Sequence, residues 1–172
     1  MKDHKNIDWQ TPDWSREKPR RFWDPSRKLL GAIRDFQKIQ HKSDPITYLR
    51  KKYCKLRHRI WTIVTGAEID LHCRIGGGLL IPHPNGVVIH PDAIIGANCL
   101  IFQQVTLAGI VELDYHVDIG AGAKLLGPLK VGHSARIGAN AVVTHNVSSN
   151  QTVVGIPARP IAIKSSEPAT NN

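Results

Sequence analysis

The stretch "IHPDAIIGANCLIFQQVTLAGIVELDYHVDIG", residues 89–120, places an aliphatic residue at every sixth position. The spacing continues without a slip through Ile89, Ile95, Ile101, Leu107, Leu113, Ile119, Leu125, Val131, Ile137 and Val143. An α-helix repeats every 3.6 residues and a strand every two, so neither keeps this period. Hexapeptide repetition is typical of a parallel β-helix, a β-solenoid in which six residues form one side of a coil.

The period is interrupted once, in front of this stretch. Ile69, Ile75 and Ile81 lie six apart, but the next member, Ile89, follows eight residues later, so two extra residues enter within 82–88. The interruption reads "PHPNG", and a solenoid accommodates such an insertion by bulging it outward. Two prolines stiffen the bulge, which predicts that His83 lies on a rigid, exposed ledge. His83 there is either a pre-organised base or an ordinary surface histidine.

Charge divides the chain near Gly66. Residues 1–66 contain 17 Lys/Arg against 7 Asp/Glu, whereas residues 67–172 contain 6 against 7. A basic arm suits nucleic acid, an anionic small molecule, the acidic face of a partner or simply a solvated helical surface. The arm lacks the aromatic platform or recognition motif of nucleic-acid-binding proteins, so we expect no nucleic-acid partner.

Two helices are predicted in the basic part, after an extended lead-in. Asp24-Pro25 and Asp44-Pro45 are both start signals, and apolar residues at helical spacing follow each of them. We expect helices over 25–40 and 45–63, with their apolar stripes serving as packing surfaces. The helices would cap one end of the solenoid, whose terminal coils need covering.

Composition indicates the class of protein and the cellular compartment. The chain of 172 residues has no apolar run near the 20 or so residues of a membrane span, and its first residues show no signal-peptide pattern. Three cysteines without metal-ligand spacing indicate a reducing compartment and no metal site. We expect a cytoplasmic protein with a basic helical arm over 1–66, a solenoid over 67–164 and a flexible tail over 165–172.

Four motifs resemble those of the hexapeptide-repeat acyltransferases, and among them the serine acetyltransferases. They are the insert with its histidine, "FQQVTLAG" at 102–109, "IGAGAKLLG" at 119–127 and "GIPARP" at 155–160. The resemblance covers about residues 66–163. It implies a left-handed parallel β-helix that assembles as a trimer or a dimer of trimers. It also implies transfer of an acetyl group from acetyl-CoA to a hydroxyl.

The resemblance assigns roles residue by residue. His83 matches the catalytic base, and Glu68 matches the carboxylate that orients it, where the family usually has Asp. Gly109, Ala121 and Ala139 match positions at which the backbone lies close to the pantetheine arm of CoA. The solenoid has few cations, and three of them are candidates for the CoA phosphates: Arg136, Arg159 and Lys164.

The sequence also departs from the serine acetyltransferases. Pro82 replaces an Asp that helps to hold the amino acid, Ile110 stands where a second histidine is expected, and the first glycine of a pair is Ala108. The N-terminal region is far shorter than usual. We expect L-serine as the acceptor, in the context of cysteine biosynthesis. One alternative is a sugar of a surface polysaccharide, and another is a non-catalytic scaffold or anion-binding module.

Overall fold

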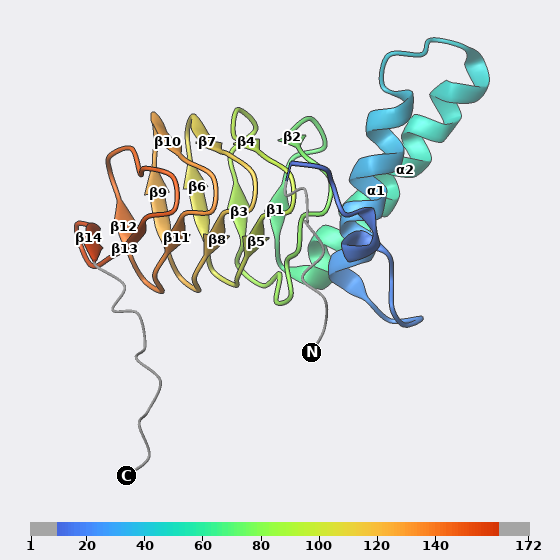
Figure 1. The fold of residues 1–172 in the computed structure, drawn as a ribbon. Coiled ribbons are helices and arrows are strands. Elements are labelled where there is room, and N and C mark those ends of the chain that lie inside the picture. Colours follow the sequence, from blue (N-terminus) through green and yellow to red (C-terminus); the bar gives the residue numbers. More distant parts are fainter. Residues whose placement is uncertain (1–9, 162–172) are drawn as a thin grey trace, which may run out of the picture.

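A computed structural model describes residues 10–161, which form a helical hairpin followed by a β-solenoid (Figure 1). The helices are η1 (Trp14–Glu17), α1 (Pro25–Ile39) and α2 (Pro45–Thr65). The strands are β1 (Glu68–Ile69), β2 (Arg74–Ile75), β3 (Val88–Ile89), β4 (Ile94–Ile95), β5 (Leu100–Ile101), β6 (Thr106–Ala108), β7 (Val111–Leu113), β8 (Asp118–Ile119), β9 (Lys124–Leu126), β10 (Leu129–Val131), β11 (Arg136–Ile137), β12 (Val142–Val143), β13 (Thr152–Val154) and β14 (Arg159–Ile161). The expected tail over 165–172 lies outside the described residues.

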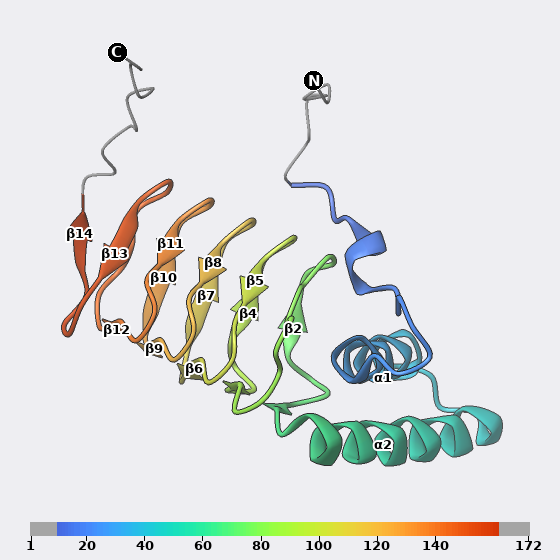
Figure 2. The ribbon, with the colours of Figure 1, turned by 90° about the horizontal axis from the view of Figure 1, so that it is seen from below.

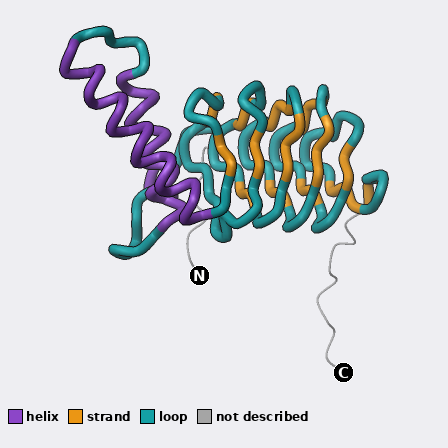
Figure 3. The backbone as a smooth tube through the Cα atoms, turned by 180° about the vertical axis from the view of Figure 1, so that it is seen from behind, coloured by secondary structure: helices purple, strands orange, loops and turns teal. Residues whose placement is uncertain are grey.

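The strands stack into three sheets, one for each side of the solenoid (Figure 3). Sheet A has the order β1-β3-β6-β9-β12, sheet B the order β10-β7-β4-β2, and sheet C the order β14-β13-β11-β8-β5. All pairings are parallel except β13 with β14. The parallel β-helix expected from the period of six is thereby confirmed.

The register between coils locates the insertion. Glu68 pairs with Val88, twenty residues on, whereas Val88 pairs with Thr106 and Thr106 with Lys124, each eighteen residues on. Three hexapeptides make eighteen, so the first coil contains two extra residues. The extra residues bulge outward in the segment around His83, as the break in the period predicts.

The repeated aliphatic residues form the core of the solenoid. The ten members from Ile89 to Val143 are at most 3% exposed. The residues that follow each by four positions are also buried, and all are small or β-branched except Leu129. Because each coil contacts only its neighbours, stability is carried by these stacked ladders.

The hairpin matches the expected helices to within two residues at each end. The apolar stripe of α1 is buried in full, as expected: Leu29, Leu30, Ile33, Phe36 and Ile39. On α2 the buried face is instead Thr47, Cys54 and Thr65, and the apolar stripe is exposed. Asp44 caps α2 through its side chain, whereas the Asp24 carboxylate accepts from the Arg20 N–H and from Arg27.

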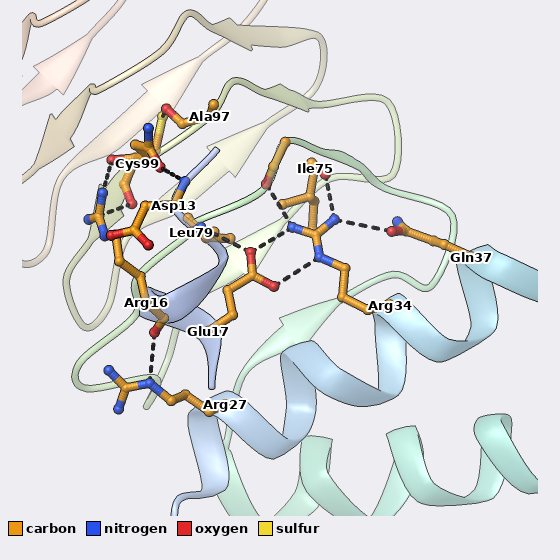
Figure 4. Close-up of polar contacts among 12 residues, drawn as sticks. Asp13, Arg16, Glu17, Arg27, Arg34, Gln37, Ile75, Leu79, Ala97 and Cys99 are labelled. Atoms are coloured by element: carbon orange, nitrogen blue, oxygen red, sulfur yellow. Dashed lines mark hydrogen bonds and ion pairs between the residues drawn. The ribbon is translucent and has the colours of Figure 1, made fainter. Parts of the chain in front are cut away.

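The helices cap the first coil with side chains. A first coil has no preceding coil to bond its backbone, so these groups need other partners. Arg34 donates to the carbonyls of Ile75 and Gly76 at 2.6 Å (Figure 4). Gln37 donates to the Cys73 carbonyl at 2.9 Å. The Glu17 carboxylate accepts from the Leu79 N–H at 3.1 Å. The lead-in, expected to be extended, therefore contains a 3₁₀ turn that buries Glu17 against the solenoid.

The other end of the solenoid is closed differently. β14 turns back and pairs antiparallel with β13, so that the last parallel strand of sheet C is covered by a short reversed one (Figure 2). No helix within residues 10–161 combines the length and apolar character that crossing a bilayer requires.

Candidate active site

The insert is held on both sides of His83. The Ser26 hydroxyl of α1 donates to the Ile81 carbonyl at 2.6 Å, and the Gly86 N–H donates to the Gly66 carbonyl at 2.9 Å. Gly86 has φ +69°, a left-handed conformation that favours glycine and closes the turn. His83 itself is exposed. The expected ledge is therefore present, and it is anchored to the helices as well as to the solenoid.

The insert begins a column of stacked corners between sheets C and A, which we call the C/A corner: residues 82–87, 102–105, 120–123 and 138–141. A backbone ladder joins its levels. Gln104 N–H donates to the Asn85 carbonyl, Gly122 N–H to Gln103 and Asn140 N–H to Ala121, at 2.8–3.0 Å. Ala121 and Ala139 thus lie on successive levels of the corner that begins with His83. Both side chains are small, and they are partly or fully exposed on the outer surface of the corner.

Glu68 and His83 lie on neighbouring coils. Glu68 begins β1, and His83 precedes β3, the strand that pairs with β1. Glu68 opens β1, directly after the hairpin, and its N–H donates to the Val87 carbonyl at 2.8 Å. Its side chain is exposed and lines a hollow of about 370 Å³ between α2 and sheet A, together with His58, Asp70 and His90. Among residues 10–161 no hydrogen bond or ion pair joins the Glu68 carboxylate to His83.

The other candidates are divided between two places. Arg136 on β11 and Arg159 on β14 are exposed on sheet C, which leads into the C/A corner. Gly109 lies on a different corner, between β6 of sheet A and β7 of sheet B. Lys164 lies outside the described residues. The structure therefore places His83 and both alanines on the C/A corner, the two arginines on the adjoining sheet C, and Gly109 across sheet A.

Two features near His83 went unnoticed in the sequence. The Gln103 side-chain oxygen is buried at the C/A corner without a hydrogen-bond partner among the described residues, although buried polar groups are normally satisfied. A hollow of about 230 Å³ beside Pro82 is lined by Arg20, Arg27 and Asp24. Gln103 sits within the quoted "FQQVTLAG" motif. Arg20 belongs to the lead-in and Arg27 to the first turn of α1, and nothing in their sequence indicated that they reach the insert.

No group of three or more His, Cys, Asp or Glu side chains in residues 10–161 is arranged to hold a metal ion. The cysteines that the structure describes are buried free thiols: Cys54, Cys73 and Cys99. Burial raises the pKa of the Cys73 thiol to about 11 and that of Cys99 to about 12. Such thiols are protonated near neutral pH and serve as small core residues rather than nucleophiles.

Comparison with known proteins gives one consistent result. The serine acetyltransferase of Synechococcus elongatus is 44% identical over 115 residues, which are 62% of this chain and 47% of that protein. The Staphylococcus aureus enzyme is 44% identical over 129 residues, 69% of this chain and 59% of that protein. The chain is homologous to the serine acetyltransferases. No protein-family model matches it.

Solved structures agree with the sequence comparison. A serine acetyltransferase in complex with CoA superposes with a TM-score of 0.69 at 29% identity, covering 81% of this chain and 57% of that one. The soybean serine acetyltransferase apoenzyme gives 0.68 at 32% identity, covering 80% and 57%. The solenoid is therefore a left-handed β-helix of the serine acetyltransferase type. The chain spans about half to three fifths of the length of these relatives.

Proposed function

We propose that the chain is an acetyl-CoA-dependent O-acetyltransferase in which His83 is the general base. The observation that carries the proposal is the C/A corner, where a rigidly held, exposed imidazole begins a ladder of small residues. His83 takes the proton from the acceptor hydroxyl while its oxygen attacks the thioester carbonyl. The carbon–sulfur bond then breaks, and the CoA thiolate receives the proton from the imidazolium.

Supporting roles follow from position. Glu68, one coil below the insert, orients the imidazole and stabilises its charged form, as a carboxylate does in catalytic triads. Ala121 and Ala139 admit the pantetheine arm. Arg136 and Arg159 bind phosphate groups from sheet C, together with Lys164, and Gly109 contacts CoA from the neighbouring corner.

L-serine is the acceptor that we propose. The relatives above are named for it, and a structure of a serine acetyltransferase complexed with cysteine superposes with a TM-score of 0.69 at 27% identity. The reaction would then contribute to cysteine biosynthesis in the cytoplasm, a reducing compartment in which three free thiols are stable.

A sugar is the second candidate, because of the hollow beside Pro82. An amino acid brings an ammonium group, which needs a carboxylate partner when water is removed. The hollow has Arg20 and Arg27 in its wall, and its one carboxylate, Asp24, is already paired with Arg27 at 2.9 Å. This surplus of positive charge favours an anionic acceptor, such as an acidic sugar.

Release of CoA thiol from acetyl-CoA tests the proposal. The purified chain should consume acetyl-CoA with L-serine, and kcat/KM for L-serine should exceed that for every sugar in a panel that includes uronic acids. A sugar preferred by tenfold or more replaces serine and leaves the His83 mechanism standing. If the chain neither binds acetyl-CoA in calorimetry nor releases thiol, the proposal is wrong and the chain is a non-catalytic scaffold.

We also propose that the chain assembles as a trimer, or as a dimer of trimers, in which the solenoids of neighbouring copies lie side by side. The C/A corner is a convex edge, so a bound substrate has a wall on one side only, and a neighbouring subunit can supply the other. Light scattering should give a mass three or six times that of the 19.1-kDa chain. A monomer at the concentration of the activity assay would contradict this assembly.

A further inference from the structure

The exposed side of α2 carries an uninterrupted apolar stripe. Its members are 49–74% exposed and are spaced by three and four residues along the helix: Ile46, Leu49, Tyr53, Leu56, Ile60 and Ile63. At 3.6 residues per turn they form one face, opposite the face that packs on α1. We call this face the α2 stripe. Figure 2 shows α2 on the outside of the hairpin, and Figure 1 shows the hairpin projecting away from the solenoid.

Positive charge flanks the α2 stripe on both sides. α2 contains six Lys/Arg residues and no Asp or Glu. Arg57 pairs with Asp35 at 2.7 Å, and Lys51 donates to two carbonyls beyond the end of α1. The remaining four form no ion pair with any described residue: Arg50, Lys52, Lys55 and Arg59. By helical position Arg50 borders one edge of the stripe, and Lys52 and Arg59 border the other.

This charge pattern selects between possible occupants of the stripe. Packing α2 on the α2 of a second copy would cover the apolar residues, but it would also bring two sets of positive flanks together without an acid to balance them. A bilayer with anionic headgroups accepts both features at once. Apolar side chains enter the headgroup boundary, while lysines and arginines reach the surrounding phosphates.

We propose that the α2 stripe is a docking surface for an anionic lipid bilayer, with α2 lying in the plane of the interface. The stripe runs from residue 46 to residue 63, about 26 Å at 1.5 Å per residue, which is typical of helices that lie on a membrane. Its cations exclude the same helix from the hydrocarbon core. This surface is separate from the C/A corner, so the inference stands independently of the proposed acetyl transfer.

Vesicle flotation of the full chain tests the inference. The protein should float with vesicles that contain phosphatidylglycerol and remain unbound with pure phosphatidylcholine, and high salt should weaken binding because the cations are exposed. Leu49→Gln combined with Leu56→Gln should reduce binding about tenfold or more, because two apolar side chains no longer enter the interface. Tyr48→Gln is the matched control, since Tyr48 is exposed on α2 outside the stripe. It should bind nearly as well as the unmodified chain.

Circular dichroism establishes that the variants are folded, which is expected because all three positions are exposed. Equal flotation with both kinds of vesicle, or none with either, would overturn the inference. So would full binding by the double variant. If light scattering shows that the double variant loses subunits, the stripe is an interface between copies of the chain, and the lipid proposal is wrong.

Discussion

The guanidinium of Arg34 and the carboxylate of Glu17 form a two-pronged ion pair, with N–O distances of 2.8 and 2.9 Å, under the first coil of the solenoid. Both side chains are largely buried, at 13% and 8% exposed. The same two groups also bond the backbone of Ile75, Gly76 and Leu79. The pair therefore joins the lead-in, α1 and the solenoid in one polar network.

Breaking this pair should destabilise the whole chain. Arg34→Met removes the charged partner of the buried Glu17 carboxylate and the side-chain donor to the Ile75 and Gly76 carbonyls, so we expect a loss of about 3–5 kcal/mol in the free energy of unfolding. Glu17→Gln combined with Arg34→Met should cost less than the sum of the single changes. Urea unfolding of the single and double variants measures these changes in the free energy of unfolding. Lys38→Met, on the same helix in an exposed pair with Asp35, is the control and should change stability by at most about 1 kcal/mol.

Substitution of His83 tests the base directly. His83→Asn keeps a polar side chain of similar size but cannot accept the proton, so kcat should fall by about 10²–10⁴-fold. The dissociation constant for CoA should be unchanged, because no role in CoA binding is proposed for the imidazole. Steady-state kinetics and calorimetry measure the two effects separately. A variant that turns over at nearly the normal rate would remove His83 from the mechanism.

Glu68→Gln should have a smaller effect than loss of His83. The imidazole remains, but its orientation and its positive charge during transfer lose carboxylate support. We expect kcat to fall by about tenfold or more with little change in KM. Asp70→Asn is the control, since Asp70 is also exposed and lines the same hollow. If both changes act equally, Glu68 has no special relation to His83.

Alkaline pH should weaken the fold through the buried thiols. Burial raises the pKa of Cys73 to about 11 and that of Cys99 to about 12, from an ordinary value of 9.0. The folded chain therefore keeps protons that the unfolded chain releases, so this stability is complete below pH 9 and is lost as pH rises toward the folded values. The denaturant concentration at the midpoint of unfolding should therefore be lower at about pH 10.5 than at about pH 8. The difference should shrink in Cys99→Ala, and an unchanged difference would contradict this origin.

Much of the fold could be predicted because the solenoid is encoded locally. Each inward position is fixed by its own hexapeptide, so the core, the insertion and the ledge at His83 follow from counting along the chain. The contacts of Glu17 and Arg34 could not be predicted in this way. They join residues far apart in sequence, and in the sequence both residues resemble ordinary surface charges.

The candidate site was predicted in part for the same reason. Ala121 and Ala139 lie eighteen residues apart, one full coil, so their common corner follows from the period. The position of Gly109 on another corner also follows from the period, but matching motifs to a family does not use that information. The hollow at Pro82 could not be anticipated, because it depends on how the lead-in folds back over the first coil.

The antiparallel pairing of β13 with β14 has a consequence for the behaviour of the chain in concentrated solution. A stack of parallel coils ends in a row of unpaired backbone groups, which can template the edge of another molecule and so start a growing fibre. The reversed strand covers that row on sheet C, and Pro160 at its centre has no N–H to offer to an incoming strand. The helical hairpin covers the opposite end, so both ends of the described solenoid carry a feature that disfavours end-to-end pairing of copies.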